Sequence, residues 1–210
     1  MHEVARGVYQ LHGQPAHLFN VYLIENLLVD AGTAWARRRI LRQVAGRDLK
    51  AHVVTHAHSD HFGSSRAICD ALSIPLWAGA ADRSAIQAGT PQMRAGVLSS
   101  LVGRMVPRPP ACDVQRALSE GDEIAGFTVL EVPGHTPGHI ALWREQDRVL
   151  LCGDVYSHLG RVTRPPTLFT LDPRMNDESR RRLAELRPRL VLFGHGRPLR
   201  LGPAERLPVQ

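Results

Sequence analysis

The chain has 210 residues, of which 43% are hydrophobic and 22% are charged, so it can fill a hydrophobic core and is too apolar to be disordered. No stretch approaches the roughly 20 apolar residues that a membrane-spanning helix needs, and the N-terminus lacks the apolar stretch of a secretory signal. We therefore expect a cytoplasmic protein that does not bind membranes.

The net charge of +6 is carried almost wholly by arginine, because Lys50 is the only lysine among 26 basic residues. A basic protein can bind nucleic acid. Here the arginines are scattered, and the short runs at 37–39 and 180–182 fall inside helix-like stretches, so solvated helix faces explain them better. We expect no nucleic-acid partner. The odd number and irregular spacing of Cys69, Cys112 and Cys152 favour reduced, buried thiols.

The first half of the chain alternates strand-like and helix-like segments, the pattern of an α/β layer. An opening hairpin is expected because two apolar, strand-like stretches are separated by a Gly-Gln-Pro turn. The expected strands are 4–11, 18–24, 27–29, 51–55 and 75–78, and the expected helices are 35–44, 63–72 and one that begins near residue 80.

Residues 88–111 differ from their surroundings, because glycines and prolines alternate there with large apolar residues. Positions 94, 97, 98, 101, 102 and 105 have helical spacing, which predicts one short helix flanked by loops. Such a Met and Leu stripe suits the core, and it also suits a lid that shapes a pocket. The sequence leaves both interpretations open.

The second half is rich in strands and ends with one strong helix. Strands are expected at 123–124, 127–132, 140–143, 149–152 and 190–193. Residues 172–186 predict a helix, with Pro173 in its first turn. Two successive halves, each of strands followed by a helix, predict an α/β fold with four layers, an αββα sandwich, in one domain that spans residues 1–210.

The strand at 51–55 ends in a cluster of metal-ligand side chains: His56, His58, Asp60 and His61 lie within six positions. In an extended segment His56 and His58 point to the same side, while Asp60 and His61 lie past the turn and can reach a second position. A solvated loop would gain nothing from imidazoles that serine or asparagine could not supply. The spacing therefore predicts a metal site with room for two ions.

These residues match the HxHxDH motif of the metallo-β-lactamase fold superfamily, which this chain resembles. That family takes its remaining ligands from three later motifs, and all three occur here in the expected order. They are Pro-Gly-His-Thr-Pro-Gly-His at 133–139, Cys-Gly-Asp at 152–154 and Gly-His-Gly at 194–196. The resemblance extends from about residue 20 to about residue 198.

The resemblance implies two ligand groups that share one carboxylate. His56, His58 and His135 would hold the first metal, Asp60, His61 and His195 the second, and Asp154 would bridge them. Imidazole and carboxylate ligands without thiolate favour zinc, and iron or manganese accepts the same set. The best-known β-lactamase branch has cysteine in place of Asp154, so this chain follows the hydrolase and lactonase branches instead.

The activity implied is hydrolysis of a small ester, thioester or lactone. A water shared by two such cations loses its proton near neutral pH and becomes the nucleophile. Asp60 is the catalytic residue that would orient this water and take up a proton later. Tyr156 or His158 would donate to the oxyanion or the leaving group, or else take no part.

Three further residues near the motifs have supporting or structural interpretations. The family keeps an aspartate beneath the metal loop at the position of Asp30, although an ordinary turn carboxylate would look the same. His139 belongs to the Pro-Gly-His-Thr turn, where a structural hydrogen bond is the commoner use. His52 is out of phase with the metal motif and is expected at the surface or in the core.

Two other functions are compatible with the motifs. A mononuclear iron persulfide dioxygenase would use His56, His135 and Asp154, but the Gly-Cys-Gly-Arg stretch that such enzymes carry after the bridging aspartate is missing; residues 157–161 read Ser-His-Leu-Gly-Arg. A non-catalytic metal-binding protein is the other alternative, and nothing in such a protein would explain a complete second ligand group.

Overall fold

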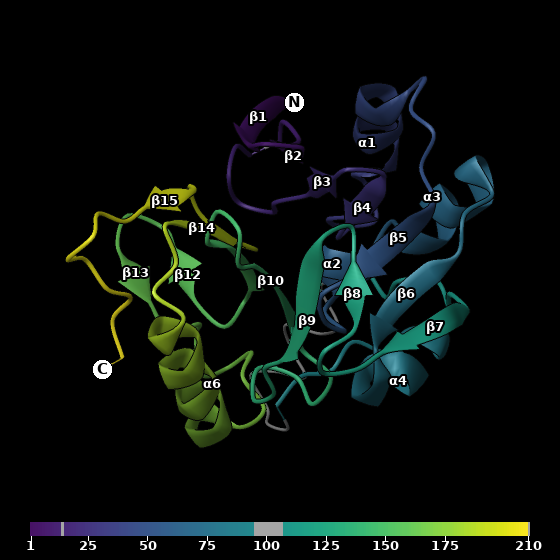
Figure 1. Ribbon diagram of the computed structural model, residues 1–210. Helices are drawn as coiled ribbons and strands as arrows, with labels where there is room; N and C mark the ends of the chain where they lie inside the picture. The colour runs from purple at the N-terminus through teal and green to yellow at the C-terminus, as the bar shows by residue number, and fades with distance from the viewer. Residues whose placement is uncertain (14, 95–106, 210) are drawn as a thin grey trace.

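The computed structural model describes residues 1–13, 15–94 and 107–209, and its strands form two main sheets (Figure 1). The first sheet has seven strands that lie side by side in chain order. They are β1 (His2–Ala5), β2 (Val8–Gln10), β3 (Tyr22–Ile24), β4 (Leu27–Val29), β5 (Ala51–Val54), β6 (Leu76–Gly79) and β7 (Val114–Leu118). The strands from β4 to β7 are parallel, and those from β1 to β4 are antiparallel.

The second sheet has six strands and comes almost entirely from the C-terminal half. Its spatial order is β15 (Leu199–Arg200), β14 (Leu190–Phe193), β11 (Val149–Gly153), β10 (Ile140–Arg144), β9 (Phe127–Glu131) and β8 (Glu123–Ile124). Only β11 and β14 pair in parallel. A separate two-stranded ribbon joins β12 (Ser157–His158) to β13 (Val162–Thr163).

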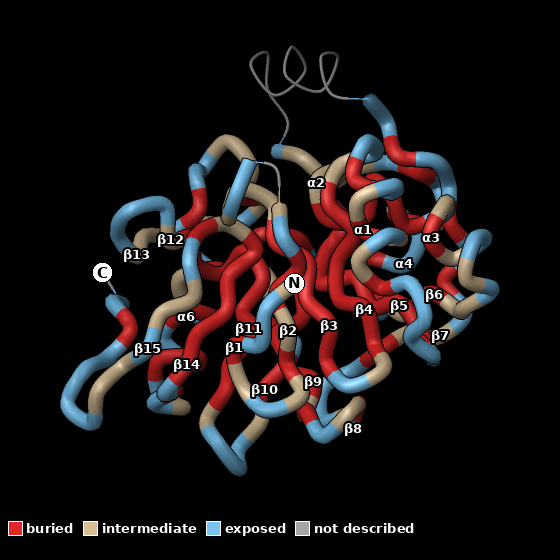
Figure 2. Tube along the Cα trace, turned by 90° about the horizontal axis from the view of Figure 1, so that it is seen from above, coloured by how far each residue is buried: buried red, intermediate tan, exposed pale blue. Residues whose placement is uncertain are grey.

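Helices cover the outer faces of both sheets. Figure 2 shows the buried strands in the middle of the molecule, with α6 (Pro173–Glu185) on one side and α1 (Arg37–Val44), α3 (Ser65–Leu72) and α4 (Arg83–Gln87) on the other. Side chains of the two sheets form one core between them, and each sheet forms further cores with its own helices. These four layers confirm the predicted αββα sandwich.

Local chemistry explains where the longest helix begins. Asp172 accepts hydrogen bonds from the backbone N–H groups of Arg174 and Met175, and Pro173 occupies the first helical position. An acidic N-cap followed by proline satisfies donors that the helix leaves unpaired and presets the first turn. The helix predicted at 172–186 is therefore confirmed.

The structure differs from the sequence prediction at several elements. The stretch 4–11 is not one strand, because Gly7 adopts φ +70° and turns β1 back onto β2. Strand β7 and the short strands β12, β13 and β15 were not predicted. A short helix, α2 (Ser59–Phe62), lies inside the metal motif, where only a turn was expected. The helix expected over 94–105 falls almost wholly outside the described residues.

Among the described residues, no helix is long and apolar enough to cross a membrane.

The sheets bring the motif-bearing loops to one edge of the sandwich. Strands β11 and β14 are parallel, so their carboxyl ends meet, and β10 is antiparallel to β11, so the turn that precedes β10 lies at the same end. The backbone N–H of Ile140, at the start of β10, donates to the carbonyl of Thr55, which follows β5. The ends of β5, β9, β11 and β14 therefore surround one small volume.

Candidate metal centre

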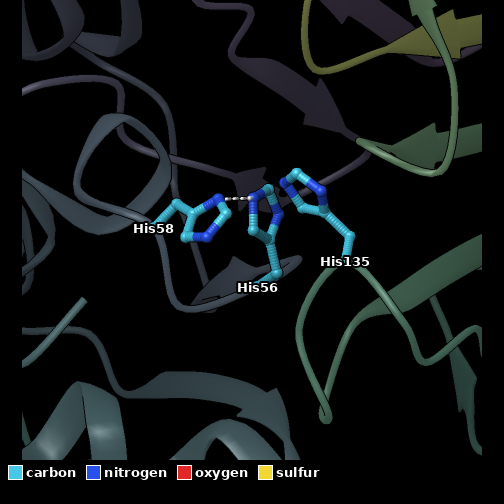
Figure 3. Close-up of side chains that lie close together, drawn as sticks. All are labelled: His56, His58 and His135. Carbon is cyan, nitrogen blue, oxygen red and sulfur yellow. Dashed lines mark hydrogen bonds between the residues drawn. The ribbon is translucent and has the colours of Figure 1, made fainter. Parts of the chain in front are cut away.

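Seven side chains with metal-ligand chemistry converge at this edge. They come from the loop after β5 (His56, His58), from α2 (Asp60, His61), from the β9–β10 turn (His135) and from the ends of β11 (Asp154) and β14 (His195). Their ligand atoms form three overlapping groups, each with all atoms within 4.8 Å of one another: His56, His58 and His135; His56, His61 and Asp154; Asp60, His61 and His195. Figure 3 shows the first group, with the three imidazoles facing one another.

The carboxylate of Asp154 lies between the two outer groups. Its Oδ2 atom is 2.9 Å from His195 Nε2 and 3.5 Å from the Nε2 atoms of both His61 and His135. His56 Nε2 is 3.9 Å away. One oxygen atom is thus within reach of ligands from both groups, which is the position that a bridging carboxylate requires.

All five candidate histidine ligands have their outer ring nitrogen hydrogen-bonded. Carbonyl or carboxylate acceptors fix the outer N–H of three rings: His58 Nε2 donates to Gln92 O (2.5 Å), His61 Nδ1 to Asp30 Oδ2 (2.9 Å) and His195 Nδ1 to Leu18 O. The rings of His56 and His135 donate to hydroxyl groups instead. His56 Nδ1 donates to Thr55 (3.0 Å) and His135 Nδ1 to Thr170 (3.2 Å), because each hydroxyl already gives its own proton to another acceptor. Each neutral ring therefore turns a lone pair inward.

The inward-facing lone pairs of these histidines lie close together, an arrangement that cations stabilise. His56 Nε2 lies 3.2 Å from His58 Nδ1, and His61 Nε2 lies 3.5 Å from His195 Nε2. Two lone pairs at such distances repel each other unless a proton or a metal ion lies between them. His135 Nε2 and Asp154 Oδ1 are buried with no hydrogen-bond partner among the described residues. The donor set therefore fits two divalent cations.

The protonation preferences of the rings agree with this. Burial holds the pKa of His56 and that of His135 well below the ordinary value, so both rings are neutral, the form that binds metals. Burial also acts to lower the pKa of His195, but the carboxylates of Asp154 and Asp60 outweigh it and raise that pKa to about 10. Carboxylates that hold a proton so firmly attract cations at the same place.

Comparisons with known proteins decide the family. The sequence-family model of the metallo-beta-lactamase superfamily matches residues 19–195 of this chain. The chain belongs to this superfamily. It is 30% identical to the probable metallo-hydrolase YflN of Bacillus subtilis (strain 168), over 94% of this chain and 86% of that protein. It is 31% identical to the hydroxyacylglutathione hydrolase of Bdellovibrio bacteriovorus, over 70% of this chain and 48% of that enzyme.

Solved structures of the superfamily share the fold. The di-iron-bound form of TTHA1623 is 28% identical and matches with a TM-score of 0.64, over 92% of this chain and 88% of that one. TTHA1429 from Thermus thermophilus is 26% identical, with a TM-score of 0.68 over 94% of this chain and 76% of that one. The chain is therefore a metal-dependent hydrolase of the metallo-β-lactamase superfamily, and the resemblance inferred from its motifs is confirmed.

Asp30 supports the superfamily motif from beneath. Its carboxylate accepts from the backbone N–H and the hydroxyl of Thr55 and from His61 Nδ1. Asp30 adopts φ +61°, a left-handed conformation that is uncommon for residues other than glycine and that aspartate tolerates better than most. These contacts match the supporting role predicted for Asp30 and set the orientation of the His61 ring.

Asp82 is a second supporting carboxylate, which the sequence did not reveal. It lies at the end of the 3₁₀ helix η1 (Ala80–Asp82) and is fully buried. It accepts from the backbone N–H of Ala57 (2.7 Å), the hydroxyl of Thr136 (2.6 Å) and the backbone N–H of Gly138 (2.7 Å). One carboxylate thus ties the loop of His56 and His58 to the turn that carries His135.

Asn20 holds the loop that carries His195, and the sequence did not reveal this role either. Its amide donates to the carbonyls of Phe193 (2.8 Å) and Gly196 (2.7 Å), on either side of His195. The hydroxyl of Tyr22 donates to the same Phe193 carbonyl (2.8 Å). Neither residue belongs to a recognisable motif, because the contact joins positions more than 170 residues apart in the sequence.

The contacts of Tyr156 agree with the interpretation in which it takes no part in the reaction. Its side chain is fully buried against α6, and its hydroxyl donates to the carbonyl of Arg180 (2.8 Å), so it is not available to an oxyanion at the metal centre. His158 is half-buried and donates from Nδ1 to the carbonyl of Arg197 (2.7 Å). A neutral His158 therefore offers only an acceptor at Nε2, and it can donate to a substrate only when doubly protonated.

Two further histidines, His139 and His52, make structural contacts. His139 Nε2 accepts from the backbone N–H of Asp154 (3.2 Å), which agrees with the structural use expected for it. His52 is a core histidine, with Nδ1 bonded to the carbonyl of Leu28 (3.0 Å) and Nε2 to the hydroxyl of Ser65 (2.8 Å).

Replacing Asp82 with asparagine tests its structural role. Asp82→Asn puts an amide NH₂ opposite N–H and O–H donors, so we expect the free energy of unfolding to fall by about 1–3 kcal/mol. The metal-loaded variant should also release metal to a chelator faster than wild type. Urea denaturation and a colorimetric chelator assay measure the two effects. Asp48→Asn, at an exposed carboxylate, is the matched control, and equal behaviour of the two variants would contradict this role.

Proposed function

We propose that this chain is a dinuclear metal-dependent hydrolase of a small ester, thioester or lactone. The observation that supports the proposal is the pair of ligand groups on either side of Asp154. His58 and His135 lie with His56 in one group, and Asp60 and His195 lie with His61 in the other. A mononuclear centre would leave the group of Asp60, His61 and His195 without a function. The outer nitrogens of His61 and His195 are nevertheless hydrogen-bonded, as are those of the histidines in the first group.

The donor set favours zinc, and iron is a concrete alternative because TTHA1623 is described in a di-iron-bound form. Two such cations, when bound, would acidify a shared water and polarise the carbonyl of the substrate. The residues that would hold them are His56, His58 and His135 for one ion and Asp60, His61 and His195 for the other, with Asp154 between the two.

Asp60 is the residue that we assign to proton handling. Its side chain is 27% exposed, whereas that of Asp154 is 5% exposed, so a substrate or water can reach the Asp60 carboxylate more readily. Burial acts to raise the pKa of Asp60, but His61 and His195 outweigh it and lower the pKa well below its usual range. An ionised carboxylate at this place can accept a hydrogen bond from the attacking water, orient it and later take up its proton.

Aromatic surface next to the centre indicates where an organic substrate would lie. The ring of Phe19 meets the imidazole of His195 edge-on, with 5.7 Å between the ring centroids. Phe19 is only half-buried. An apolar, half-buried side chain beside a candidate ligand that is itself partly exposed suits the uncharged part of a small ester, thioester or lactone.

Metal analysis tests the dinuclear assignment. Protein purified without added metal should contain about two transition-metal ions per chain. His58→Ala and His195→Ala should each lower that number, because each removes a ligand of a different group. His2→Ala, at an exposed histidine outside the motifs, should leave it unchanged. Wild-type metal content in His195→Ala would contradict the assignment, and one iron with oxygen consumption on a persulfide would favour the dioxygenase instead.

Asp60→Asn separates ligation from proton handling. The amide keeps an oxygen ligand of the same shape, so metal binding should be restored by excess metal. Turnover of the best substrate from a thioester and lactone panel should still fall by about 10²–10⁴, the usual contribution of acid–base participation. The measurement is kcat at full metal loading, with Asp48→Asn as the control. Near-wild-type turnover by fully loaded Asp60→Asn would leave the metals alone to activate the water.

A further inference from the structure

A second group of reactive side chains lies away from the metal centre, in a surface cavity of about 600 Å³. It is lined by Arg66, Cys69 and Asp70 of α3, by Cys112 and Asp113, which precede β7, and by Gln115 of β7. Two of the three cysteines of the chain thus face the same cavity, although 42 residues separate them in the sequence.

The fold holds the two thiols together. Cys112 is buried and belongs to the core cluster that contains Phe62 and Ile86, and the half-buried Cys69 packs against that cluster. The Cys112 backbone N–H donates to the carbonyl of Ile86 (3.3 Å), which fixes the segment beneath α3. The two side chains therefore pack in one cluster and line one cavity.

The surroundings make the two sulfurs chemically unequal. The interaction with the Cys69 thiol lowers the pKa of Cys112, and the guanidinium of Arg66 lowers it further, against burial and the charges of Asp70 and Asp113. The same interaction raises the pKa of Cys69. Cys112 is therefore the sulfur that ionises first, and a thiolate is the form that reacts with oxidants.

We propose that Cys69 and Cys112 form a reversible disulfide in which a peroxide oxidises Cys112 and Cys69 then closes the bond. The Cys112 thiolate attacks one peroxide oxygen, which breaks the O–O bond and gives a sulfenic acid and hydroxide. The sulfur of Cys69 then attacks Cys112 Sγ and loses its proton to that hydroxide, which becomes water. The displaced sulfenic hydroxyl takes up the proton that Cys112 released when it ionised, and it leaves as a second water. In sum, two thiols and one hydrogen peroxide become one disulfide and two waters, and two equivalents of a small thiol reverse the reaction.

The bond would close a loop that contains Asp82 and Gln92. These two residues contact the metal loop, through the Ala57 backbone and the His58 ring respectively. A cross-link that restricts the unfolded chain over residues 69–112 would stabilise the part of the fold that supports those contacts. Oxidation is thereby expected to make the metal loop harder to unfold.

Cys152 supplies an internal control. It is fully buried in β11, beneath α6, and its Sγ faces the carbonyl of Gly153 (3.6 Å). Burial raises its pKa, and it does not line the cavity of the other two cysteines. We expect Cys152 to remain a thiol under conditions that oxidise the pair.

The test exposes the metal-loaded full chain to hydrogen peroxide, alkylates the remaining thiols and measures intact and peptide masses. The expected product has lost two hydrogen atoms, contains a Cys69–Cys112 cross-linked peptide and returns to the dithiol with dithiothreitol. Its thermal unfolding midpoint should exceed that of the reduced protein. Full alkylation of both cysteines after oxidation, or oxygen added to Cys112 without a cross-link, would overturn the proposal.

Single variants assign the two sulfurs. Cys69→Ser should stop at a Cys112 sulfenic acid that dimedone traps. Cys112→Ser should react with peroxide at least about tenfold more slowly, because the thiolate is the reacting form and the remaining Cys69 thiol ionises less readily. Cys152→Ser should still form the bond. Arg66→Gln, at a side chain outside the metal centre, should slow oxidation of Cys112 several-fold. Equal peroxide reactivity of Cys69→Ser and Cys112→Ser would contradict the assignment of Cys112 as the reacting sulfur.

Discussion

A buried carboxylate surrounded by imidazoles is the constraint on which the rest of the structure depends. Asp154 is 4% exposed, and four histidine nitrogens lie within 3.9 Å of its Oδ2 atom. Burying an ionised carboxylate without compensation costs several kcal/mol, so this arrangement is stable only when positive charge is placed beside it. Protonated imidazoles supply that charge in part, and two cations would supply it fully. The four ligand loops must therefore be held at fixed separations.

Hydrogen bonds between the loops hold those separations. Asp82 joins the loop after β5 to the β9–β10 turn, and Asn20 joins the first sheet to the loop of His195. The backbone itself must also come close at two places. A Cβ atom on Gly79 would lie 2.0 Å from the carbonyl oxygen of Gly138, and one on Gly194 would lie 2.0 Å from Asp154 Oδ1. Glycine is needed at both positions because the loops leave no room for a side chain.

The sequence marked the candidate ligands more clearly than their supports, for a physical reason. Ligands cluster in motifs such as His56-x-His58-x-Asp60-His61, because neighbouring positions in one loop can reach the same ions. Supports such as Asp82 and Asn20 act across the sandwich, so their partners lie far away in the sequence and no local pattern marks them. The sandwich itself followed from strand and helix periodicity. The β1–β2 turn at Gly7 did not, because the apolar pattern continues through it. The role of Tyr156 stayed open in the sequence, because the partner of its hydroxyl lies on α6.

The proposed centre has two cations that share Asp154, and X-ray diffraction at the absorption edge of the bound metal tests this most directly. Anomalous difference maps of metal-loaded crystals should show two peaks on either side of Asp154 Oδ2. One peak should lie against His58 and His135, and the other against Asp60 and His195. A single peak against the first group, or peaks that Asp154 does not contact, would contradict the account.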